Sequence, residues 1–281
     1  MESNRNDRIL PESRWLAALV IPFLAAAFGI LYVFPQETGR LFAWKIQPSM
    51  SAMMLGAAYA GGIYFFTAVL MTNRWHQVKV GFWPVITFAS LLGIATILHW
   101  DRFTPGHISF YAWAGLYFTA PFIVLVVWFR NRPQDSGQPE LSDAAVPRPV
   151  RWVIGIIGLI TLGVSLFLFL LPALMINLWP WTLSPLTARV VGAMFALPGL
   201  VGLGLAADSR WSSAQIILQA QSFSIVLILG AAARSRADFD PANPGTWLFV
   251  GGLAAMLAGT LILYGFVDAQ RRRQVQLLKT A

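Results

Sequence analysis

The twenty residues WVIGIIGLITLGVSLFLFLL, at positions 152–171, carry no charged side chain and decide the fold class. A helix crosses the hydrocarbon core of a bilayer with about 20 predominantly apolar residues. Comparable stretches recur along the whole chain, and the alternating pattern of a membrane β-barrel is missing. The sequence therefore predicts an all-α integral membrane protein with about eight transmembrane helices. The expected spans are residues 15–34, 51–71, 81–100, 109–129, 152–176, 187–207, 211–231 and 246–268.

The composition agrees with a membrane protein. Of the 281 residues, 57% are hydrophobic and only 11% are charged, whereas a soluble domain has about 25% charged residues. The chain has no cysteine, which excludes disulfides and thiolate–metal chemistry. The net charge of +8 is interpreted as a topology determinant, because basic residues in membrane proteins collect in the cytoplasmic loops. No nucleic-acid partner is expected.

The 20 lysines and arginines are distributed unevenly between the two sides of the expected bundle. The side that holds both termini and the even-numbered loops has 14 of them, and the opposite side has 6. By the positive-inside rule, both termini are expected to be cytoplasmic. The six on the opposite side are Arg40, Lys45, Arg102, Arg189, Arg234 and Arg236.

Short motifs recur at a nearly constant offset, which predicts an internal duplication. Each copy would hold four spans, an even number, so the two copies would be parallel and related by a pseudo-two-fold axis along the membrane normal. The first repeat is expected at residues 1–131, a cytoplasmic linker at 132–150 and the second repeat, with a basic tail, at 151–281. The recurring pairs are Arg14-Trp15 with Arg151-Trp152, Trp44-x-Ile-x-Pro48 with Trp181-x-Leu-x-Pro185, Arg74-Trp75 with Arg210-Trp211, Phe103 with Phe239, and Trp113 with Trp247.

Residues 41–56 and 179–189, which carry the duplicated Trp-x-(Ile/Leu)-x-Pro element, resemble segments of uncharacterised multi-pass membrane proteins of bacteria. The resemblance covers a short segment in each half. It implies a bacterial cytoplasmic membrane. That group has no assigned activity, so no catalytic residue follows from it.

The duplicated element supplies three candidate ligand-binding residues on the outer face: Trp44, Lys45 and Trp181. Aromatic side chains at this depth favour one of two roles. They form a structural lid that closes each half, or they form the rim of an outward-facing ligand pocket.

Polar side chains also occur in two places within or beside the spans: on one face of the seventh span and near the start of the sixth. Gln215, Gln219 and Ser222 follow the i, i+4, i+7 spacing of one helix face, which suits either helix–helix hydrogen bonding or the lining of a pocket. Arg189 lies near the start of the sixth span, where a cation opposes the helix dipole. An anion is therefore expected beside it, with Lys45 contributing. A lipid phosphate and a dedicated acidic ligand are both open.

The sequence indicates no reaction. The spans contain no Asp, Glu, Lys or Arg near their centres, and His76, His99 and His107 all lie at or beyond span ends. This pattern predicts no catalytic residue, no haem or other cofactor and no metal site. The favoured function is non-enzymatic binding or passage of a small neutral, lipid-like or anionic ligand between the two halves. An accessory subunit of a larger membrane complex and an intramembrane enzyme acting on lipid or quinone are the alternatives. Membrane lipids are the expected partners in each case.

Overall fold

The computed structural model describes residues 6–139 and 143–280, with side chains up to residue 271. Within these residues the chain is helical and contains no β-strand. Eight helices are long and apolar enough to cross a membrane, which confirms the prediction of a multi-pass helical membrane protein. The long helices are α1 (Pro11–Phe28), α3 (Ser49–Met71), α4 (Phe82–Leu98), α5 (Ile108–Asn131), α6 (Arg148–Leu170), α8 (Pro185–Ala207), α9 (Trp211–Arg234) and α10 (Pro244–Thr280).

The fifth span is shorter than the sequence predicts. It was expected to continue to residue 176, but α6 ends at Leu170, and the short helix α7 (Pro172–Ile176) follows. Proline has no amide hydrogen, and its ring clashes with the preceding turn. Leu171 accordingly leaves the helical conformation, with φ −124° and ψ 53°. Pro172 thus terminates the span instead of kinking it.

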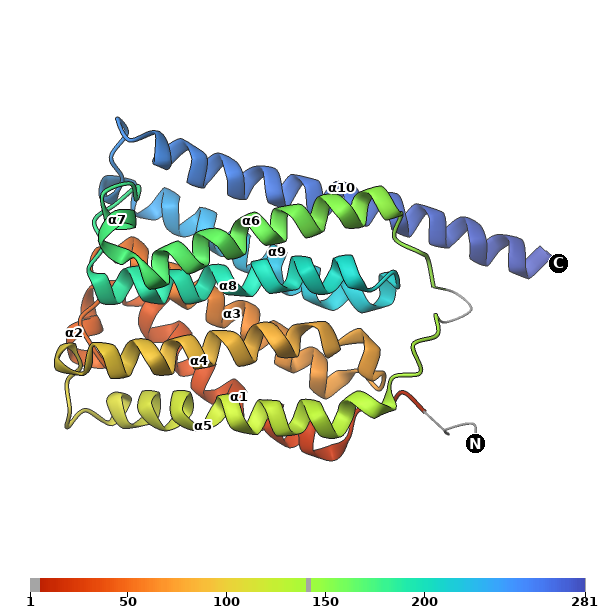
Figure 1. Cartoon of the computed structure of the whole chain (residues 1–281), viewed down its shortest axis with the longest axis horizontal. Coiled ribbons are helices and arrows are strands. Elements are labelled where there is room, and N and C mark those ends of the chain that lie inside the picture. The colour runs from red at the N-terminus through yellow and green to blue at the C-terminus, as the bar shows by residue number, and fades with distance from the viewer. Residues whose placement is uncertain (1–5, 140–142, 281) are drawn as a thin grey trace.

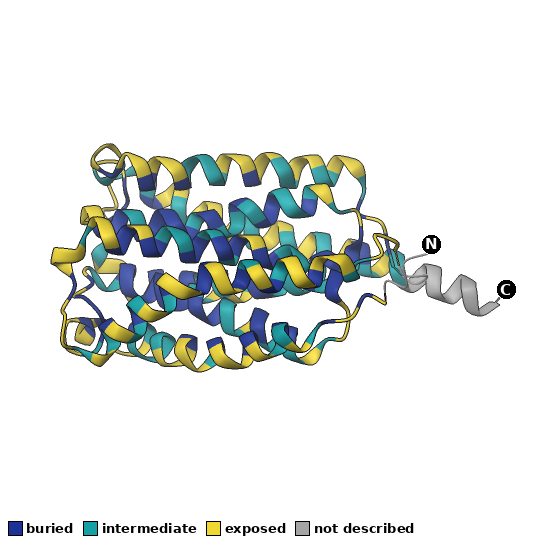
Figure 2. Cartoon of the chain, turned by 60° about the horizontal axis from the view of Figure 1, so that its bottom comes forward, coloured by how far each residue is buried: buried dark blue, intermediate teal, exposed yellow. Residues whose placement is uncertain are grey.

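The helices form an inner and an outer group. The inner helices α3, α4, α8 and α9 connect the two halves, because α3 packs against α9 and α4 packs against α8. The outer helices cover them: α1 lies on α3, α5 on α4, α6 on α8 and α10 on α9. In α3, 61% of the apolar window is buried, against 6% in α10. Figure 2 shows the same gradient, with the segments coloured as exposed concentrated on the outside of the bundle.

The bundle has two distinct ends, seen at the right and left of Figure 1. The linker end carries residues 6–10, 72–81, 132–147 (of which 140–142 lie outside the described residues) and 208–211. The far end carries the connections 34–48, 99–107, 171–184 and 235–243, including α7 and the short helix α2 (Thr38–Leu41). The start of the described chain, at residue 6, and the C-terminal end of α10 both lie on the linker side.

Several contacts occur twice, at sequence offsets of 136 or 137. One pairing differs from the sequence prediction. Trp113 packs on Trp44 with ring centroids 4.7 Å apart, but the residue that packs on Trp181 in the same way is Phe249, at 5.0 Å, and Trp247 is 67% exposed. The other repeated contacts are Gly56 on Leu31 with Gly192 on Leu168, Thr104 N to Ala43 O with Asp240 N to Pro180 O, and Trp75 N to Asp7 O with Trp211 N to Ala144 O.

The Arg-Trp pairs have structural partners inside the protein. Arg14 donates to the carbonyl oxygens of Leu70 and Thr72, and Arg151 donates to that of Ala206. These carbonyls lie at or just beyond the C-terminal ends of α3 and α8, where a cation is favourable. The tryptophans divide into two groups: Trp15 and Trp152 are exposed, whereas Trp75 and Trp211 are fully buried. Membrane anchoring therefore suits only the first group.

Candidate functional site

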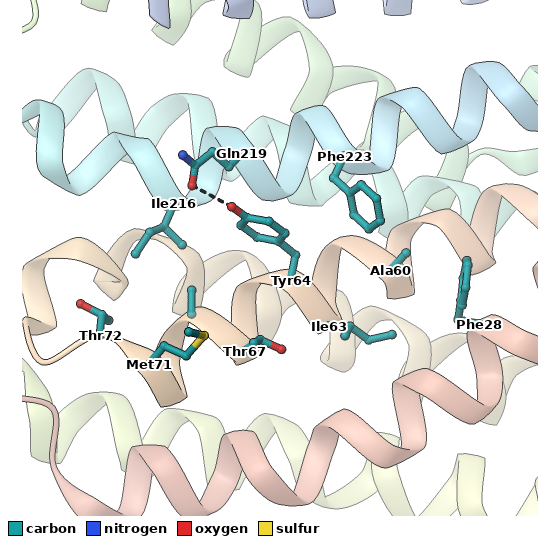
Figure 3. A pocket seen from close by; sticks show the side chains of 11 residues that line it. Phe28, Ala60, Ile63, Tyr64, Thr67, Met71, Thr72, Ile216, Gln219 and Phe223 are labelled. Atoms are coloured by element: carbon teal, nitrogen blue, oxygen red, sulfur yellow. Dashed lines mark hydrogen bonds between the residues drawn. The ribbon is translucent and has the colours of Figure 1, made fainter. Parts of the chain in front are cut away.

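A groove of about 680 Å³ lies between α1, α3 and α9 (Figure 3), and most of its lining residues come from the halves of α3 and α9 nearer the linker end. Its size falls in the range of small-molecule sites. The lining is mostly apolar, and the groove opens sideways, because Tyr64 and Phe223 at its edge are 38% and 43% exposed. The lining residues are Phe28, Ala60, Ile63, Tyr64, Thr67, Ala68, Met71, Thr72, Ile216, Gln219 and Phe223.

A chain of side-chain hydrogen bonds supplies the polar groups of this groove. Tyr64 Oη on α3 donates to Gln219 Oε1 on α9 at 2.9 Å, as Figure 3 shows. Gln219 Nε2 donates in turn to Tyr264 Oη on α10 at 2.5 Å, and Gln215 lies beside the same hydroxyl. The polar face of α9 thus joins three helices, and one of its members, Gln219, also faces the groove.

Gln219 retains hydrogen-bonding capacity. A side-chain amide offers two hydrogens and two lone pairs, and each half of the Gln219 amide has one protein partner. One donor and one acceptor therefore remain for a ligand. A hydroxyl, an ester or a ketone would satisfy them, because none of these groups brings a charge into an apolar site.

Trp44 and Trp181 lie elsewhere, in two aromatic clusters at the far end. Each indole is 3% exposed. Trp44 packs among Phe42, Phe103 and Trp113, while Trp181 donates from Nε1 to Ser51 Oγ at 2.8 Å. Buried aromatic clusters of this kind stabilise a core. Both tryptophans are therefore buried, Trp181 partly against α3 of the other half, and of the two roles expected from the sequence this burial favours the structural lid over the rim of an open pocket.

The two candidate cations of the far end, Lys45 and Arg189, lie in different surroundings. Lys45 is exposed, and its aliphatic stem packs against Gly39. Arg189 donates from Nη1 to His99 Nε2 at 2.7 Å. The anion site expected from the sequence beside Arg189 and Lys45 therefore stays a prediction.

A second polar arrangement, which sequence reasoning missed, lies at the linker end. His76 contacts Asp7 through Nδ1 and Ser212 Oγ through Nε2, the latter at 2.9 Å. Ser212 Oγ also donates to Asp143 Oδ2 at 2.6 Å. Residues 76 and 212 are 136 apart, and so are 7 and 143. No local motif identifies the arrangement, because its four members come from four separate segments.

The order serine, histidine, aspartate matches that of a hydrolytic triad, but the protons are placed differently. A nucleophilic serine must donate its hydrogen to the histidine base. Ser212 donates its only hydrogen to Asp143, so the hydrogen in the Ser212–His76 contact comes from His76 Nε2. The histidine therefore holds its proton where a base would need a free lone pair. This arrangement fits a structural clamp between the N-terminal segment, the linker and α9.

An ion cluster lies beside this clamp. Arg210 pairs with Asp135 and Asp208 at 2.8 Å each, and Lys79 approaches the same carboxylates at 2.7 and 2.9 Å. Burial alone would raise the pKa of both carboxyl groups, but hydrogen bonds from Arg210 and Lys79 outweigh it and hold each pKa well below its ordinary value. In the sequence, Lys79 and Arg210 served only to predict the membrane topology. Their pairing fastens the loop before α4 to both the linker and the loop before α9.

The described side chains contain no group of three or more histidine, aspartate or glutamate residues placed to hold a metal ion. The chain matches no protein-family model, no curated protein and no solved structure.

Proposed function

We propose that the protein binds a neutral, lipid-like molecule in the groove between α1, α3 and α9, without changing it chemically. The observation that carries this proposal is the residual hydrogen-bonding capacity of Gln219 on the wall of an otherwise apolar groove. An acyl or isoprenoid chain would pack on Ile63, Ile216 and Phe223, with its hydroxyl or carbonyl group at Gln219. The sideways opening gives such a molecule access from the hydrocarbon phase.

The groove is formed by both halves of the chain. α3 belongs to residues 1–131 and α9 to residues 151–281, so a ligand in the groove would lie between the two halves. We infer that these halves are two copies of one four-helix unit, related by a pseudo-two-fold axis along the membrane normal. The contacts repeated at offsets of 136 and 137 support this inference, as does the reciprocal packing of α3 on α9 and of α8 on α4.

Filling the groove should displace its ligand. Thr67→Phe places a ring in the groove, while Thr119→Phe makes the same change on the exposed face of α5. We expect mass spectrometry of the lipids that co-purify with the full-length protein to find an enriched apolar species with the wild type and with Thr119→Phe. Thr67→Phe should retain about tenfold less of it, equivalent to about 1.4 kcal/mol of binding free energy.

Thermal unfolding of both variants in the same detergent checks that Thr67→Phe remains folded. Equal lipid retention by the two folded variants would contradict the proposal. So would a protein subunit that co-purifies in fixed ratio in place of lipid, because an accessory role would then explain the chain better.

We further propose that the protein resides in a bacterial inner membrane with the linker end in the cytoplasm. The excess of lysine and arginine on that side supports this orientation. Reporter fusions after residues 40, 104, 182 and 240 are expected to read periplasmic, and fusions after 140 and 275 cytoplasmic. A periplasmic reading at residue 140 would contradict both the orientation and the parallel arrangement of the two halves.

A further inference from the structure

The start of α8 holds a cation whose charge no carboxylate of the described residues balances. Arg189, the fifth residue of this helix, lies partly buried at the far end of the bundle. Its Nη1 contacts His99 Nε2 at 2.7 Å, and its Nε is buried without a hydrogen-bond partner. Among the described residues, no carboxylate lies within ion-pair distance of Arg189. Placing a cation in such a site is unfavourable unless a counter-charge is present.

His99 does not provide that counter-charge. Burial of its ring and the neighbouring Arg189 lower the pKa of His99, and Asp101 opposes this only in part. The imidazole is therefore a neutral acceptor for the guanidinium. Asp101 itself pairs with Arg102 at 3.2 Å, and both of these side chains are more than 70% exposed. The local charge around Arg189 remains positive.

The start of α3 in the first half corresponds to the start of α8 in the second half, and the charges at the two helix starts differ. There, Asp238 Oδ2 accepts a hydrogen bond from Met50 N at 2.9 Å, so a carboxylate lies at the positive end of the helix dipole. The residues at an offset of 136 invert this pattern. Arg102 corresponds to Asp238, and Arg189 corresponds to Met53, which is fully buried. The start of α3 thus has a carboxylate on its backbone N–H, whereas α8 has Arg189 at its start and an arginine, Arg102, at the position that corresponds to the carboxylate.

We propose that Arg189, positioned by His99, binds an oxyanion of the phosphate class at the far end of the bundle. A guanidinium recognises phosphate oxygens through several N–H groups in one plane, and the unpartnered Nε–H of Arg189 lies in that plane on the edge that it shares with Nη2. The charge of the anion would also complement the N-terminal dipole of α8. This site is separate from the groove at the linker half and does not depend on a ligand there. A phosphodiester lipid headgroup and free phosphate share the required chemistry.

Ligand-induced stabilisation tests the site in the full-length protein in detergent. Inorganic phosphate and short-chain phosphatidylglycerol are titrated separately, at ionic strength held constant with sodium chloride so that screening does not vary. We compare the wild type with Arg189→Met, which introduces the residue of the first half, and with Arg40→Met. Arg40 is an exposed far-end arginine already paired with Glu37 at 3.0 Å, so it is a matched control.

The wild type and Arg40→Met are expected to gain about 2–4 °C in Tm on anion binding, and Arg189→Met to gain nothing. Stabilisation by phosphatidylglycerol alone identifies a lipid headgroup, and stabilisation by both anions identifies a site open to free phosphate. Should Arg189→Met fail to fold, Arg189→Lys retains the charge but not the planar fork, and its apparent Kd should rise several-fold. A response of Arg189→Met or Arg189→Lys equal to that of the wild type, or no response in the wild type, would overturn the proposal.

Discussion

Replacing Arg210 by methionine is expected to lower the free energy of unfolding by about 3–5 kcal/mol, the effect of removing one partner from a buried ion pair. Arg210 is 5% exposed, and its two partners, Asp135 and Asp208, are nearly as buried. Without the guanidinium, two neighbouring carboxylates would remain beside Lys79 in a poorly hydrated site. Thermal or denaturant unfolding of the full-length protein in detergent measures the loss.

The same cluster should make stability depend on pH. The folded-state pKa values of Asp135 and Asp208 are depressed, so their contribution is present above the ordinary aspartate pKa of about 3.9 and is lost as pH falls toward the folded values. The stability difference between wild type and Arg210→Met should therefore be constant near neutral pH and shrink below about pH 4. Arg40→Met, which breaks a largely exposed pair, should cost at most about 1 kcal/mol. Equal losses from the two variants would show that the Arg210 cluster is not a buried electrostatic unit.

Leucine at position 158 should force α6 away from α8. A Cβ at Gly158 would lie 2.8 Å from Gly199 O and 3.0 Å from Gly202 Cα, and both are backbone atoms of α8 that cannot rotate aside. Close helix approach through small residues is a common source of stability in membrane bundles. We expect Gly158→Leu to destabilise the protein by about 3 kcal/mol, at the upper end of ordinary overpacking.

Gly163 on the same helix provides the matched control for this prediction. A Cβ there meets nothing within 4 Å, so Gly163→Leu should change the free energy of unfolding by no more than about 0.5 kcal/mol. Both variants are compared by thermal unfolding in one detergent. If the two leucine variants unfold at the same temperature, the close approach of α6 and α8 is not an important source of stability.

The sequence predicted best those features that depend on one continuous segment of the chain. Eight spans could be counted because each is a continuous apolar run, and their ends were wrong mainly where proline chemistry decided, as at Pro172. Arg189 could be singled out because a cation near a helix start is unfavourable wherever that helix lies. For Trp44 and Trp181 the sequence left two roles open, because an aromatic residue near a span end suits the membrane interface and a buried cluster equally well.

The amino-acid sequence by itself thus determined membrane residence, the number of spans and the position of Arg189 near a helix start, since these follow from local composition. Only the tertiary structure decided which span ends meet. It placed His76 beside Ser212 and Arg210 beside Asp135, and it brought Tyr64 to Gln219 on the wall of the groove. These partners lie far apart along the chain, and their contacts depend on the packing of α3 on α9 and of α4 on α8. Every span is apolar enough to lie beside any other, so hydrophobicity alone does not specify those neighbours; close steric fit and paired polar groups do.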